Sequence, residues 1–147
     1  MTICHCPRCG EPVPAEQAPP SLRCSAEVYE KLGRSLARRR QERFVVVALD
    51  ARNRPIRCHV VAVGSVAAVV VHPREVFAPL IRDRAVAAIV LHNHPSGGPV
   101  EPSVEDAEIT RRLADVGRLL GIPLLDHVIV GKNGYCSMRD LGQVRFP

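Results

Sequence analysis

The chain has 147 residues, of which 46% are hydrophobic and 3% aromatic, with no tryptophan and a net charge of +5. This length suffices for one core of ordinary size plus a small appendage, and that core must be aliphatic. No run of about eighteen apolar residues occurs, so we expect no membrane span. The first residues lack a basic and then apolar leader, so we expect a cytoplasmic protein.

Cysteines and prolines dominate residues 1–24, which we interpret as a unit separate from residues 25–147. Cys6 and Cys9 are two residues apart, as in a zinc knuckle. Cys24, together with Cys4, would complete a structural zinc site with four sulfur ligands, and His5 is a substitute ligand. Four cysteines in a reducing compartment favour metal over disulfides. The alternative is a cysteine-rich tail that binds nothing.

The next segment has apolar side chains at four-residue spacing, Val28, Leu32 and Leu36, which predicts a helix beginning at Ser25. Five arginines follow within residues 34–43. Such a cluster suits nucleic acid phosphates. However, arginine also complements the end of a helix, and no aromatic residues are interleaved for base stacking. Nucleic acid is therefore only a second-ranked partner.

Residues 44–49 and 56–63 have the composition of two strands, joined by a loose turn into a hairpin. Residues 73–83 predict a short helix with a proline in its first turn. Glu75 lies in the same turn, where the helix dipole favours an ionised carboxylate. Cys58 and Cys136 fall in apolar, strand-like runs, and we expect both to be buried thiols.

The stretch from His92 to Asp106 is the richest in chemistry. Residues 85–91 have the length and β-branched content of a buried strand, and alternate residues of a strand face the same way. His92 and His94 should therefore project together from its carboxyl end. A loop rich in proline and glycine leads to Ser103 and Asp106 at a helix start. Two imidazoles and a carboxylate suit zinc, and three protein ligands leave a fourth position for water, as in a catalytic site.

Each of these residues also has a simpler interpretation. Histidines at strand ends are usually surface or satisfied core residues, and Ser103 with Asp106 forms a capping-box pattern that needs no metal. The combination of all four in this order nevertheless favours a metal site.

The remaining elements complete an α/β pattern. A helix runs from about Ser103 to a terminating glycine, Gly121. Its expected apolar stripe is Ile109, Leu113, Val116 and Leu120. Residues 124–130 predict a buried strand, and a turn leads into a last short strand at residues 135–136. The order of elements predicts an α/β sandwich, with helices against a mixed sheet.

Asp126 and His127 repeat the chemistry of the metal site inside the strand at residues 124–130, where charges are costly unless paired. We favour a role in orienting a metal ligand. The alternative is a buried polar pair that satisfies backbone groups. Neither residue is predicted to be a zinc ligand.

These motifs resemble the RadC branch of the JAB/MPN (JAMM) zinc metallopeptidase family. The similar segments are His-x-His-Pro-Ser-Gly, Ser-x-x-Asp and Leu-Gly-Ile-Pro-Leu-Leu-Asp-His-Val-Ile-Val-Gly. The resemblance extends over residues 25–141 and is most specific over residues 92–131. It implies a mixed-sheet α/β sandwich of the MPN/JAB type, which is similar to cytidine deaminases.

The resemblance also implies roles for individual residues. His92, His94 and Asp106 would hold zinc. Ser103 would support the oxyanion of the tetrahedral intermediate. Glu75 would act as general base, because Pro-Arg-Glu-Val-Phe at residues 73–77 matches the corresponding family segment. Spacing alone would not choose Glu75 over Glu101 or Glu105. The chain departs from the family at one point, with eight residues between His94 and Ser103 where seven are usual.

Two classes of function follow. The first is a zinc hydrolase that cleaves peptide or isopeptide bonds in a protein or peptide substrate. The alternative is a non-catalytic metal-binding module in a DNA-repair or nucleic-acid-associated context. Zinc deaminases fit badly, because they need His-x-Glu followed by Pro-Cys-x-x-Cys. The intact set of ligands, base and hydroxyl favours the hydrolase.

Overall fold

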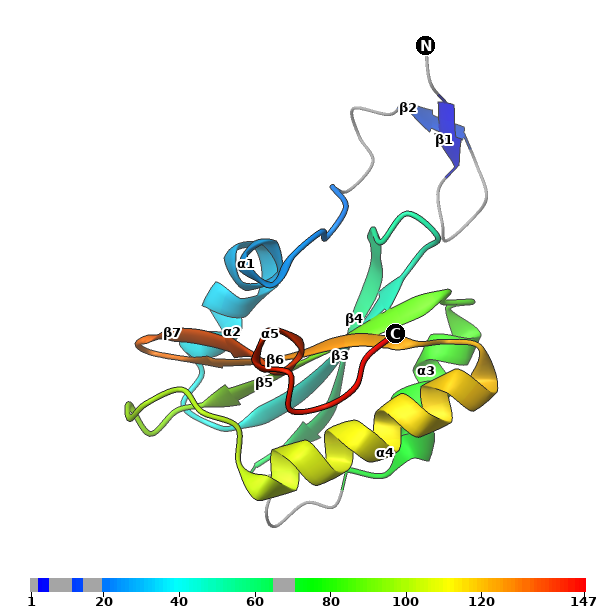
Figure 1. Cartoon of the computed structure of the whole chain (residues 1–147). Coiled ribbons are helices and arrows are strands. Elements are labelled where there is room, and N and C mark those ends of the chain that lie inside the picture. Colours follow the sequence, from blue (N-terminus) through cyan, green and yellow to red (C-terminus); the bar gives the residue numbers. More distant parts are fainter. Residues whose placement is uncertain (1–2, 6–11, 15–19, 65–70) are drawn as a thin grey trace.

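The structure, a computed structural model, describes residues 3–5, 12–14, 20–64 and 71–147. Its main body is a five-stranded sheet with helices on both faces (Figure 1). In order across the sheet, the strands are β4 (Pro55–Val63), β3 (Arg43–Leu49), β5 (Ala87–His94), β6 (Leu124–Gly131) and β7 (Gly134–Ser137). A separate two-stranded sheet pairs β1 (Ile3–His5) with β2 (Pro12–Pro14).

The sheet is mixed, as predicted. Strand β3 runs antiparallel to both β4 and β5, whereas β5 and β6 are parallel, and β7 returns antiparallel to β6. The parallel pair is joined by a crossover through helix α4 (Val104–Leu120). Strand β5 therefore lies in the middle of the sheet, and residues 87–93 are buried on both of its faces.

Helix α3 (Pro73–Arg82) and helix α4 cover one face of the sheet. Helix α4 ends at Gly121, whose φ of 70° is left-handed, as expected for a terminating glycine. The predicted stripe is only partly confirmed, because Leu120 is half exposed. The fully buried positions are Asp106, Thr110, Leu113, Ala114 and Gly117. Gly117 lets α4 lie close to the chain that leads into β6, because a Cβ added at position 117 would lie only 2.6 Å from the carbonyl oxygen of Ile122.

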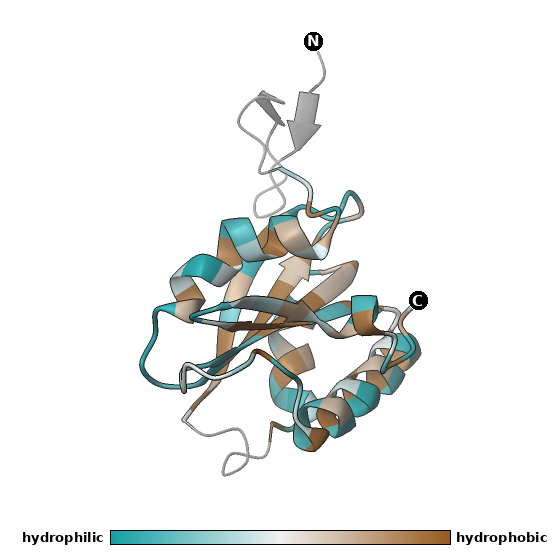
Figure 2. Cartoon of the chain, turned by 60° about the vertical axis from the view of Figure 1, so that its left-hand side comes forward, coloured by the Kyte–Doolittle hydropathy of each residue, from teal (hydrophilic) through white to brown (hydrophobic). Residues whose placement is uncertain are grey.

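The other face of the sheet is covered by the helical run at residues 25–37. It consists of α1 (Ser25–Val28), a π-helical turn η2 (Tyr29–Gly33) and α2 (Arg34–Ala37), and it confirms the predicted helix. Its buried side chains join a second apolar cluster. Figure 2 shows the strands between the two helical layers mostly in brown, the colour of hydrophobic residues.

Three details of the fold differ from expectation or add to it. Cys58 is exposed and Cys136 is only partly buried, because β4 and β7 are the two edge strands. The expectation of two buried thiols was therefore wrong. A short helix that the sequence analysis did not predict, α5 (Met138–Leu141), follows β7. Within the described part of the chain, no helix is long and apolar enough to cross a bilayer.

Candidate metal centre

Strand β5 carries both histidines of the predicted site. It continues to His94, so the histidines belong to the strand itself and do not follow it. Val90 and His92 face the layer of α4, because side chains alternate between the two faces of a strand. His92 pairs with Phe44 on β3 and with Ile129 on β6, which fixes its position from both sides.

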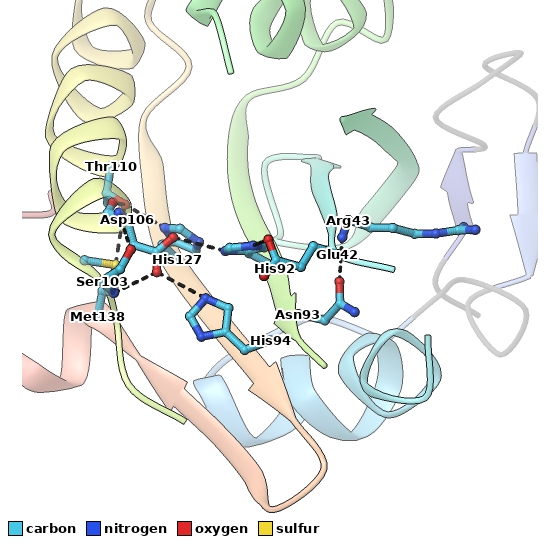
Figure 3. A network of polar contacts seen from close by, with 10 residues as sticks. All are labelled: Glu42, Arg43, His92, Asn93, His94, Ser103, Asp106, Thr110, His127 and Met138. Carbon is cyan, nitrogen blue, oxygen red and sulfur yellow. Dashed lines mark hydrogen bonds and ion pairs between the residues drawn. The ribbon is translucent and has the colours of Figure 1, made fainter. Parts of the chain in front are cut away.

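The structure brings His92, His94 and Asp106 together (Figure 3). One ligand atom from each of the three lies within 4.8 Å of the others. His92 Nδ1 is 3.1 Å from Asp106 Oδ1, and His94 Nε2 is 3.3 Å from Asp106 Oδ2. His92 is 2% exposed and Asp106 is 1% exposed, whereas the side chain of His94 is 21% exposed. The cluster is therefore closed toward the core and open at His94.

The electrostatics of the cluster favour a charged carboxylate. Burial alone would raise the pKa of Asp106, but hydrogen bonds from His92, His94 and the Ser103 backbone hold it far below its usual range. The hydrogen bond to Asp106 raises the pKa of His94, and burial opposes that shift. At neutral pH, Asp106 is therefore a carboxylate that attracts positive charge.

The residues present fit a zinc ion. Two imidazole nitrogens and a carboxylate oxygen form a donor set that zinc accepts, with room for one further ligand. The Nε2 atom of His92 is buried and makes no hydrogen bond within the described residues. The donor atoms that face one another in the cluster are His92 Nδ1, His94 Nε2 and the two carboxylate oxygens of Asp106.

Ser103 and Asp106 also form the capping box that the simpler interpretation predicts. The backbone N–H of Asp106 donates to Ser103 Oγ, and the backbone N–H of Ser103 donates to Asp106 Oδ2. Ser103 is exposed, and its oxygen acts here as an acceptor. Its hydroxyl proton therefore stays available for a ligand, so the two interpretations are compatible.

The carboxylate that the structure places beside the cluster is that of Glu42, a residue that the sequence analysis did not consider. Glu42 Oε2 lies 3.6 Å from His92 Nε2, and its side chain is 28% exposed (Figure 3). Glu75 lies in the first turn of α3 with its side chain 64% exposed, and its carboxylate faces Arg74 at 3.3 Å. The surroundings of Glu75 do not support the role that the resemblance gave it.

Asp126 and His127 have different surroundings: Asp126 fits the interpretation as a buried polar group that satisfies its neighbours, and His127 lies nearer the candidate ligands. Asp126 accepts hydrogen bonds from the His127 backbone, the Arg139 backbone and Ser137 Oγ, so it satisfies buried groups around β7 and α5. Burial raises its pKa, and these bonds oppose the shift. It has no described contact with the three candidate ligands.

His127 lies closer to the candidate metal centre. Thr110 Oγ1 donates to the carbonyl oxygen of Asp106 at 2.5 Å and lies 2.6 Å from His127 Nδ1. Since the single Thr110 proton goes to Asp106, His127 Nδ1 must be the donor of the second bond. Burial lowers the pKa of His127 to about 3, which keeps the ring neutral. His127 thus supports the turn of α4 that carries Asp106.

The predicted zinc site at Cys4, Cys6, Cys9 and Cys24 falls mostly outside the described residues. Cys6 and Cys9 are not described, and for Cys4 only the backbone in β1 is described. Cys24 is a free, exposed cysteine just before α1. A structural zinc in this segment stays a prediction.

A mixed five-stranded sheet between helices, with a candidate metal cluster at the carboxyl end of its central strand, defines an α/β domain of the JAB/MPN class. The chain belongs to the RadC-like JAB domain family, whose model matches residues 22–143. This confirms the resemblance found in the sequence.

Three similar proteins illustrate the relationship, and all are named UPF0758 protein. The protein from Symbiobacterium thermophilum is 50% identical over 78% of this chain and 49% of its own length. The one from Trichlorobacter lovleyi is 48% identical over 80% of this chain and 50% of its own length. The one from Syntrophotalea carbinolica is 46% identical over 78% of this chain and 50% of its own length. The chain therefore spans about half the length of these relatives, and their names state no activity.

Proposed function

We propose that the chain is a zinc-dependent hydrolase of amide bonds, with a peptide or isopeptide bond as its substrate. The observation that carries the proposal is the cluster of His92, His94 and Asp106, which is buried on one side and open at His94. These residues would hold the zinc ion. When bound, zinc would supply a Lewis acid for the scissile carbonyl and a water with a pKa of about 7.

Glu42 is the best-placed general base. Its carboxylate would accept the proton of the attacking water and pass it to the leaving amine. The 3.6 Å separation from His92 supports this role, because a base must lie within reach of the ligand cluster. Partial exposure lets the carboxylate meet a substrate without a change in the core.

Ser103 would donate its hydroxyl proton to the oxyanion that develops on the carbonyl oxygen. One such donor typically contributes about 3 kcal/mol to lowering the barrier. Its oxygen is held by the backbone N–H of Asp106, which fixes the hydroxyl next to the cluster. The hydroxyl would therefore be oriented before the substrate arrives.

The test combines zinc analysis with a peptidase assay. The purified chain is dialysed against a mild chelator, and zinc is measured in the wild type, His92→Ala and His59→Ala. His59 is a matched control, because it also pairs with a carboxylate, Asp83, but on the edge strand β4. Only His92→Ala should lose the site's zinc.

Hydrolysis is then followed on a quenched-fluorescence library of random peptides, before and after zinc is restored. Cleavage that depends on zinc and is absent in His92→Ala is the expected result. Zinc retention equal to that of the wild type in His92→Ala would contradict the metal site. Zinc binding without hydrolysis of peptides or of an isopeptide-linked substrate would favour the non-catalytic module.

A further inference from the structure

Asn93 lies between the two candidate histidine ligands but faces the other side of the sheet. It is completely buried, at 0% exposed. Its Oδ1 accepts a hydrogen bond of 2.6 Å from the backbone N–H of Arg43. Its Nδ2 donates to the carbonyl oxygens of Gln41, at 3.0 Å, and of Arg39, at 3.4 Å. One side-chain amide thus binds three backbone groups of one segment.

The position of this amide has a clear structural meaning. The β3–β5 ladder has Phe44 opposite His92 as its last pair, and the next residue along β5 is Asn93. The chain before Arg43 is not in a strand, so it has no ladder partner of its own there. The Asn93 amide offers both a donor and an acceptor, as a peptide group does. The side chain of Asn93 thus makes the hydrogen bonds that a further residue pair between β3 and β5 would otherwise make.

The segment that Asn93 holds is the one that carries Glu42. Gln41 and Arg43, the two neighbours of Glu42, are both bound to Asn93. The carbonyl oxygen of Glu42 accepts a further bond that anchors the segment, from the backbone N–H of Gly64, at 2.8 Å. The backbone of Glu42 is therefore fixed, and its carboxylate lies 3.6 Å from His92 Nε2.

We infer that Asn93 is a positioning residue, which sets the distance between the base Glu42 and the metal ligands on β5. The inference rests on the proposed function. Strand alternation explains how it works: His92 and His94 face the metal side, and the residue between them faces the segment of the base. Residues 92–94 therefore supply two metal ligands and, through Asn93, also hold the segment that carries the proposed base.

Two substitutions separate this role from simple packing. Asn93→Asp preserves the shape and the acceptor for Arg43, and in its carboxylate form it cannot donate to Gln41 and Arg39. Asn93→Ala removes all three bonds. Asn133→Ala is the control, because Asn133 Nδ2 also donates to a backbone carbonyl, that of Gly97, but on an exposed loop.

Three readouts are compared in these variants. In both Asn93 variants, zinc content should equal that of the wild type. In Asn93→Ala, the amide of Arg43 should exchange its hydrogen at least about tenfold faster, whereas Asn93→Asp keeps the acceptor and should leave this amide protected. On a peptide that the wild type cleaves, kcat should fall about 100-fold with little change in KM, as expected when a catalytic group is displaced by about 1 Å. In a chain that already carries Glu42→Gln, the Asn93 substitutions should cause no further loss, because both changes act through one carboxylate.

The outcomes distinguish this inference from the proposed function. If the wild type cleaves nothing, the proposed function fails, and hydrogen exchange alone decides whether Asn93 holds the segment. Unchanged exchange at Arg43 in Asn93→Ala would overturn the inference. A loss of zinc with unchanged exchange, or kinetic effects of Asn93→Ala and Glu42→Gln that simply add, would overturn it as well.

Discussion

Ser103 and Asp106 hold each other at the start of α4 through two reciprocal hydrogen bonds of 3.0 Å and 2.8 Å. The same Asp106 carboxylate faces His92 and His94, so one residue is both a helix cap and a candidate metal ligand. The bond from the Ser103 backbone fixes the direction of the carboxylate before any ion arrives. A fixed ligand loses less conformational entropy on binding.

Replacing Asp106 by asparagine separates these two roles. The amide oxygen can still accept from the Ser103 backbone, so helix content should be kept and the metal-free protein should lose no more than about 2 kcal/mol of stability. The negative charge is lost, so the variant should release its zinc to a mild chelator. Circular dichroism and zinc analysis after dialysis check both parts.

Asp140→Asn is the matched control, because Asp140 also follows a serine cap by three residues, at the start of α5. This control should keep its zinc. Full retention of zinc by Asp106→Asn would make Asp106 a cap only.

A second prediction concerns the two candidate bases. Glu42→Gln should keep zinc and lose nearly all hydrolysis, because an amide cannot accept the proton of the water. Glu75→Gln should stay within about twofold of the wild type, since the Glu75 side chain is mostly exposed beside Arg74. Both are measured as initial rates on one cleaved peptide. The reverse pattern would restore Glu75 as the base.

The neutral state of His127 predicts a dependence of stability on acid. Its folded pKa is lowered to about 3, whereas an unfolded histidine has a pKa of about 6.5. Between these values the unfolded chain binds a proton that the folded chain does not, so stability is full above about pH 6.5 and falls as the pH drops toward about 3. The loss from this group approaches about 1.4 kcal/mol per pH unit.

His127→Asn should remove this contribution while keeping an N–H for Thr110. Urea unfolding of the metal-free wild type and the variant at several pH values gives the comparison. Their difference in unfolding free energy should shrink as the pH falls below about 6.5. Parallel curves for the two proteins would show that His127 is not buried as a neutral ring.

The boundary of the core predicts how truncation acts. Leu22 is 3% exposed, packs into the cluster under the helical run at residues 25–37, and donates its backbone N–H to the carbonyl of Asn53. Removing residues 1–20 should therefore leave the unfolding free energy of the main body nearly unchanged. Removing residues 1–24 should cost about 2–5 kcal/mol, as burial of one leucine is lost.

Urea unfolding of the two truncated chains, with Leu22→Ala in the full chain as the control, checks this expectation. Zinc analysis adds a second result, since removal of residues 1–20 should lower the zinc content from two ions to one if Cys4, Cys6 and Cys9 hold the second. Equal stability of the two truncated chains would place Leu22 outside the core.

Much of the fold could be predicted because local signals agree with it. The apolar run of β5, the serine cap of α4 and the C-terminal glycine of α4 are each recognisable from neighbouring residues in the sequence. The same local signals brought His92, His94 and Asp106 together. The buried face of α4 was predicted less well, since apolar character alone does not show that Ala114 and Gly117 allow close approach to the sheet.

Glu42 could not be identified from local signals. It lies 50 positions before His92 in a segment that looks like an ordinary basic loop, and its proximity depends on the register between β3 and β5. Asn93 fixes that segment from the opposite face. A motif search finds ligands that are close in sequence. The proximity of Glu42 depends on the pairing of β3 with β5, so it can be recognised only from the assembled sheet.

Strand β5 lies in the centre of the sheet, and this position limits which parts of the domain can change. A strand with hydrogen bonds to neighbours on both sides cannot slide by one residue without breaking two ladders at once. The two histidines are thereby held in a fixed position relative to both neighbouring strands. The free margins of the sheet and the loop at residues 95–102 can change in length and composition while the centre keeps its geometry.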